Sequence, residues 1–63
     1  MAIYHIEYLD SGGKVSNSEH LTYRDDQEVL YAAARLIGHH QAVEVWDRTR
    51  VVGRLTADEC RRL

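Results

Sequence analysis

The chain has 63 residues, of which 44 % are hydrophobic and 29 % charged, with no proline and a formal net charge of −2. This length leaves room for one small domain, and the composition is typical of a folded domain rather than a disordered tail. The single cysteine excludes an internal disulfide, and no Cys/His spacing matches a structural zinc site. Because there is no membrane-spanning run and no signal-peptide pattern, we expect a cytoplasmic protein without membrane contact.

The first third of the chain predicts a hairpin. Residues 2–9 are rich in Ile and Tyr and predict a strand, in which one face is entirely apolar. The core positions of this strand are Tyr4, Ile6 and Tyr8. A turn at 10–13 contains two glycines, and residues 14–23 then predict a second strand. This strand is apolar only toward its far end, so we expect an exposed edge strand.

A helix is predicted in the middle of the chain. Asp25 or Asp26 is a suitable N-cap, residues 27–37 favour a helix, and Gly38 ends it. At 100° per residue the apolar positions form one stripe. That stripe consists of Val29, Ala33, Leu36 and Ile37, with Leu30 and Ala32 at its edges.

The last third predicts a second hairpin. Residues 42–47 and 51–55 alternate as strands around a turn at 47–50, with Val43, Val45, Val51 and Leu55 facing inward. Thr56 and Glu59 then form a capping box before a short helix over 57–63. The whole chain therefore predicts a single α+β domain over 1–63 with ββαββ order. We expect a four-stranded, mainly antiparallel sheet, one helix packed on one of its faces and a short C-terminal helix.

Several of these segments resemble small bacterial ββαββ proteins of unknown function. The likeness rests on Ile-Tyr-His-Ile-Glu-Tyr at 3–8, the Asp-Ser-Gly-Gly turn, and the closing hairpin with Val-Trp-Asp-Arg and Val-Val-Gly-Arg. This resemblance implies the ββαββ fold and assigns no functional residue. The first hairpin and helix are also similar to the start of bacterial antitoxins with a partial double-stranded-RNA-binding fold. The chain lacks the third strand that this fold places before its helix.

No motif indicates an enzyme or a cofactor. Gly12-Gly13-Lys14 lacks the remaining P-loop residues, and Cys60 has no base fixed beside it, so it is interpreted as a small packed side chain. His5 and His20 fall on the same outer face of the first hairpin, but a closed zinc site needs four ligands. We therefore predict no metal site, and keep a pH-sensitive surface and a small histidine-based metal binder as alternatives.

Pleat alternation leaves Trp46 and Val52 on the sheet face that the helix does not cover. The predicted interaction surface comprises Trp46, Val52, Arg54, His5, Glu7 and Glu44, with Ile3 and Leu9 beside them. An aromatic anchor within a charged rim is typical of an interface, and so small a domain has little stability to spare. We expect a homodimer joined through sheet faces or edge strands, or a complex with another protein. Two alternatives remain: the C-terminal helix folds over this face, or a register slip buries Trp46 in the core.

Nucleic-acid binding is the alternative function. Residues 1–47 hold three basic and eight acidic side chains, whereas residues 48–63 hold five arginines and two acidic side chains. The acidic balance argues against nucleic acid as the main partner, because binding requires clustered cations. The basic end keeps the alternative open, with Trp46 available to stack on an unpaired base. Its candidate contacts are Arg48, Arg50, Arg54, Arg61 and Arg62.

Overall fold

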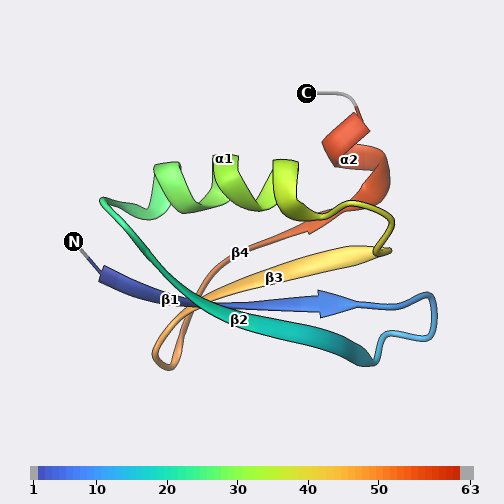
Figure 1. Ribbon diagram of the computed structural model, residues 1–63, viewed down its shortest axis with the longest axis horizontal. Helices are drawn as coiled ribbons and strands as arrows, with labels where there is room; N and C mark the ends of the chain where they lie inside the picture. Colours follow the sequence, from blue (N-terminus) through green and yellow to red (C-terminus); the bar gives the residue numbers. More distant parts are fainter. Residues whose placement is uncertain (1, 62–63) are drawn as a thin grey trace.

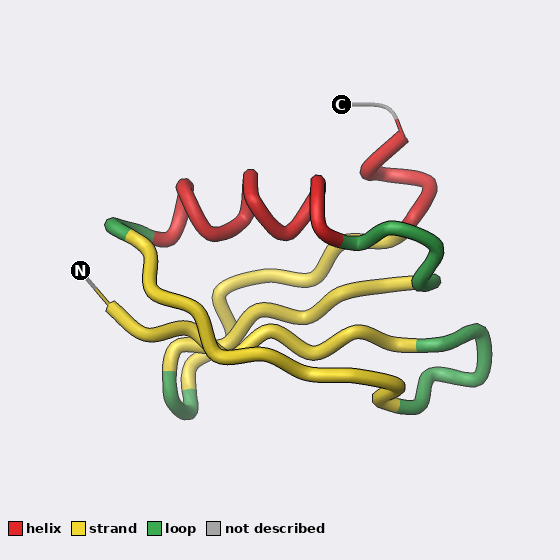
Figure 2. The backbone as a smooth tube through the Cα atoms, viewed as in Figure 1, coloured by secondary structure: helices red, strands yellow, loops and turns green. Residues whose placement is uncertain are grey.

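The computed structural model describes residues 2–61, with side chains described for residues 2–59. Within this range the elements are β1 (Ala2–Leu9), β2 (Val15–Tyr23), α1 (Asp26–Leu36), β3 (Ala42–Asp47), β4 (Arg50–Thr56) and α2 (Ala57–Arg61). The strands form one antiparallel sheet in the order β2-β1-β3-β4 (Figures 1 and 2). The predicted α+β class and ββαββ order are confirmed. The interpretation of Cys60 and the predicted contacts of Arg61 and Arg62 fall on side chains outside the described residues.

The hydrophobic core lies between the sheet and α1, which runs across one face of the sheet (Figure 1). Its buried residues come from β1, α1 and β3, with Ile37 just after the helix: Tyr4, Ile6, Tyr8, Val29, Ala33, Ile37, Val43 and Val45. The inward positions predicted for β1 and β3 are therefore confirmed. Because β1 and β3 are the two central strands, the core lies over the middle of the sheet.

The predicted signals at both ends of α1 are present. The Asp25 carboxylate accepts a hydrogen bond from the Glu28 backbone N–H at 2.8 Å, and Gly38 adopts a left-handed φ of 58°. The Glu28 side chain in turn accepts from the backbone N–H of Arg24 at 3.2 Å. One predicted position is wrong, since Leu36 is 42 % exposed. The next residue, Ile37, is buried and fills the space over the sheet at this end of the helix.

The second helix begins at the predicted capping box and lies on the same side of the sheet as α1 (Figure 1). The Glu59 N–H donates to the Thr56 hydroxyl at 3.3 Å, and that hydroxyl lies 3.2 Å from the Glu59 carboxylate. Ala57 packs against the main core cluster. The described part of α2 therefore does not cover the opposite face of the sheet.

A β-bulge in the last hairpin corrects the predicted facing of two valines. Val45 pairs with Gly53, but Trp46 pairs with Val51, so the register shifts by one residue and Val52 is the extra residue. A bulge of this kind inverts the alternation of side chains beyond it. Val51 therefore lies beside Trp46 and is 52 % exposed, whereas Val52 packs against the core cluster. The predicted inward Val51 and outward Val52 were both wrong.

Candidate functional site

The sheet face opposite α1, here called the open face, carries two rows of side chains across the strands. The aromatic row consists of His20, His5, Trp46 and Val51, which are successive cross-strand partners on β2, β1, β3 and β4. The charged row consists of Ser18, Glu7, Glu44 and Arg54, which are successive partners one pleat away. Five of the six predicted surface residues are thus neighbours on one face, and Val52 is the exception.

The two ends of the open face differ. Ile3, near the start of β1, is 65 % exposed, as the alternation of β1 predicts. Leu9, at the end of the same strand, is only 4 % exposed, so its predicted place on the exposed surface is wrong. Ala42, its cross-strand partner on β3, is equally buried. The apolar part of the open face is therefore concentrated toward Ile3 and Trp46.

A hollow of about 990 Å³ lies at this apolar end. Its lining includes Ile3, His5, Glu7, His20, Trp46 and Arg48. Asp47 also lines it, so the hollow combines apolar surface with two histidines, two carboxylates and a guanidinium. Arg48 reaches this position from the β3-β4 turn, where it adopts a left-handed φ of 59°.

The two histidines of the aromatic row are in direct contact. His5 and His20 are paired in the β1-β2 register, and His5 Nδ1 lies 2.8 Å from His20 Nε2. Their rings meet edge to face, with centroids 4.4 Å apart. On the other side of the His5 ring, Nε2 lies 3.4 Å from a carboxylate oxygen of Glu7. A hydrogen bond between two imidazoles requires one nitrogen to donate and the other to accept.

Trp46 is partly buried on the open face. Its indole Nε1 is shielded from solvent and is the one buried side-chain nitrogen or oxygen in the described part of the chain that has no hydrogen-bond partner. A shielded donor without an acceptor costs about 1–3 kcal/mol. The register places Trp46 opposite His5 and Val51, so the register slip that would have put it in the core does not occur.

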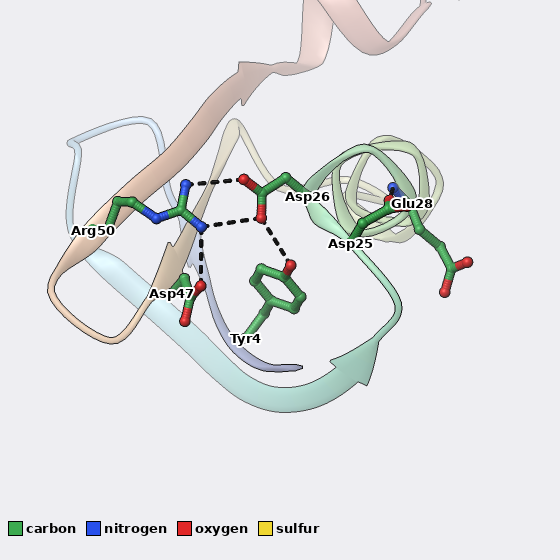
Figure 3. Close-up of polar contacts among 6 residues, drawn as sticks. All are labelled: Tyr4, Asp25, Asp26, Glu28, Asp47 and Arg50. Atoms are coloured by element: carbon green, nitrogen blue, oxygen red, sulfur yellow. Dashed lines mark hydrogen bonds and ion pairs between the residues drawn. The ribbon is translucent and has the colours of Figure 1, made fainter. Parts of the chain in front are cut away.

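Of the arginines predicted to contact nucleic acid, the three with described side chains do not lie together. Arg50 forms two hydrogen bonds to the Asp26 carboxylate, at 2.9 and 3.1 Å, and a third to Asp47 at 2.9 Å (Figure 3). Its charge is therefore paired within the chain. Arg48 and Arg54 are exposed but lie in different places, at the turn and on the charged row.

Figure 3 shows that the same Asp26 carboxylate also accepts a hydrogen bond from the Tyr4 hydroxyl, at 2.8 Å. Burial, together with this bond, raises the pKa of Tyr4 to about 12. The hydrogen bonds from Arg50 and then Tyr4 lower the pKa of Asp26. The cluster joins the start of α1 to β1 and to the β3-β4 hairpin, so we interpret it as a structural tether.

Comparisons of the chain with protein-family models, curated proteins and solved structures gave no match. The resemblance to small bacterial ββαββ proteins therefore stays a prediction. No helix within the described residues has the length and apolar character needed to cross a membrane. The described side chains also contain no group of three or more His, Cys, Asp or Glu residues placed to hold a metal ion.

Proposed function

We propose that this protein is a non-enzymatic interaction module that forms a homodimer through the open face of its sheet. The observation that carries the proposal is the apolar surface of Ile3, Trp46 and Val51, which neither α1 nor the described part of α2 covers. Exposed apolar surface gathered on one face is typical of an interaction site.

The charges on the open face favour a second copy of the same chain. Glu7 and Glu44 are direct cross-strand partners, and like charges in this relation destabilise a sheet. Arg48 lines the hollow on the other side of the aromatic row. A two-fold axis along the aromatic row would bring Glu7 and Glu44 of one copy toward Arg48 of the other. The same operation stacks the two tryptophans, as a self-complementary interface requires.

The size of the face sets the expected strength of the dimer. The Cα atoms span 31 × 24 × 15 Å, and four strands account for a width of about 14 Å. A face of this size buries on the order of 500 Å² per chain, which is below the standard of about 800 Å² per partner. We therefore expect a weak homodimer, with a dissociation constant in the micromolar range.

The described residues contain one exposed contact between a hydroxyl group and an imidazole, and the geometry of this contact supports a protein without enzymatic activity. Ser16 Oγ lies 3.2 Å from His40 Nδ1, but the same hydroxyl donates to the backbone oxygen of Tyr8 at 3.2 Å. Its only proton is thus directed away from the imidazole, which must itself donate. His40 therefore does not act as a base toward Ser16 in this arrangement.

Sedimentation equilibrium between about 10 and 500 µM tests the homodimer. We expect the average mass of the wild-type chain to rise from 7.3 kDa toward twice that value. The Trp46→Ala variant should stay near 7.3 kDa, because it loses the central apolar contact. Tyr31→Ala removes another aromatic side chain from the outer surface of α1, where it is 70 % exposed, and should behave as wild type. A constant mass for the wild-type chain, or equal loss in both variants, would contradict the proposal.

A further inference from the structure

His5 and His20 bring together two of the four nitrogen ligands that a tetrahedral metal site requires. Directly paired residues on antiparallel strands point their side chains the same way, and here two imidazole nitrogens converge at 2.8 Å on an accessible face. Neutral imidazole nitrogens are the ligands that zinc and similar transition metals prefer. Two nitrogens bound to one tetrahedral Zn²⁺ lie about 3.3 Å apart. For a metal ion to bind both nitrogens, they have to separate by about half an ångström and the proton between them has to leave.

Glu7 lies beside the His5 ring nitrogen that does not contact His20. The carboxylate lies 3.4 Å from His5 Nε2, which favours the tautomer with hydrogen on that nitrogen. The other nitrogen, Nδ1, then holds a lone pair that accepts the hydrogen bond from His20 Nε2, and a metal ion that displaces this proton can bind both nitrogens. A carboxylate behind a histidine in this way is the usual outer support of a metal ligand. The neighbouring carboxylate of Glu44 adds negative potential, whereas Arg48 at the rim of the hollow opposes it.

A single chain cannot complete the site from its described residues, because they contain no third suitable ligand near the pair. We infer that two copies complete it: His5 and His20 of each copy together form a four-histidine site for a divalent transition-metal ion such as Zn²⁺. The inference rests on the proposed homodimer, whose two-fold axis along the aromatic row places one histidine pair opposite the other. Sheets packed face to face lie about 10 Å apart, which is the distance that two opposed imidazoles and a metal ion span.

The test combines zinc titration with measurement of mass. We expect ZnCl₂, titrated calorimetrically into the full-length chain, to bind at one ion per two chains. Zinc should also lower the dimer dissociation constant at least about tenfold in sedimentation equilibrium, and EDTA should reverse this. Co²⁺ in place of Zn²⁺ should give the strong visible absorption of a tetrahedral site. His5→Ala and His20→Ala should each abolish these effects while circular dichroism shows an unchanged fold.

Two matched controls exclude other zinc ligands. His39→Ala removes an exposed histidine from the loop after α1 and should leave the zinc effect intact. Cys60→Ser removes the only thiol of the chain and should do the same. Zinc that binds one ion per chain, or that acts equally on the His20→Ala variant, would overturn the inference. A homodimer that forms with no response to zinc would overturn it and leave the proposed function standing. A monomer with and without zinc would overturn both.

Discussion

Asp26 shows how one carboxylate can interact with a helix dipole and with two other side chains. It lies in the first turn of α1, where a negative charge is favoured by the helix dipole, and it accepts hydrogen bonds from both Arg50 and Tyr4. These contacts stabilise the ionised carboxylate, so the pKa of Asp26 is lower in the folded chain than in the unfolded chain. By linkage, the ionised group stabilises the fold above its unfolded pKa, and that stabilisation is lost as the pH falls through the folded pKa.

We therefore predict that the melting temperature of the wild-type chain falls as the pH drops below about 4. Asp26→Asn should melt at a lower temperature than wild type at pH 7 and lose less on acidification, since its side chain cannot be protonated in this range. Thermal melts followed by circular dichroism between pH 2 and 7, at one low protein concentration, measure this. Glu44→Gln removes a carboxylate from the open face and serves as the control. Parallel pH profiles for wild type and Asp26→Asn would contradict the prediction.

Among single residues, strand alternation predicted most side-chain directions in β1 and β3, but the sequence missed the contacts between residues far apart in the chain. The inward tyrosines of β1 and the shared face of His5 and His20 both result from a period of two. The bond between Asp26 and Arg50 joins residues 24 positions apart, and only the packing of α1 against the sheet brings them together. The sequence indicates only a local role for Asp26, as a candidate helix cap. No local pattern identifies Arg50 as its distant partner.

Among the elements, β4 carries the main departure from the predicted fold. The bulge opposite Val45 and Trp46 exchanges the roles of two adjacent valines. Periodicity does not reveal such a bulge, because Val51 and Val52 are equally apolar and either one fits the core. In contrast, α1 was predicted nearly to the residue, since its N-cap and its terminal glycine agree and its apolar stripe departs at Leu36.

The bulge leads to a prediction that separates folding from association. Val52→Ala should lower the free energy of unfolding by about 1 kcal/mol, because Val52 packs against the core. Val51→Ser should change it by less than about 0.5 kcal/mol, but should weaken the homodimer, because Val51 lies beside Trp46 on the open face. Urea unfolding at low protein concentration measures the free energy of unfolding, and sedimentation equilibrium at high protein concentration measures the strength of the homodimer. A loss of stability in Val51→Ser together with a weaker homodimer in Val52→Ala would show that the bulge is absent in solution.

At the scale of the whole molecule, the fold covers one face of a four-stranded sheet and leaves the other accessible. Within residues 2–61 one long helix covers the sheet, and the short second helix lies on the same side. The sequence predicted this uncovered face from the number of elements. It did not predict the strand order, the hollow beside Trp46 or the burial of Leu9, since these depend on how the strands pair and the sheet twists.

Trp46 gives the most direct measurement of the central claim, because it is the only tryptophan of the chain and lies at the centre of the proposed interface. Its fluorescence emission can be followed by front-face detection as the protein is diluted from about 500 to 1 µM. We predict a shift to longer wavelength on dilution, as the indole leaves the interface and meets water, with a midpoint equal to that from sedimentation. An emission maximum that stays constant while the mass changes would show that the chains associate elsewhere.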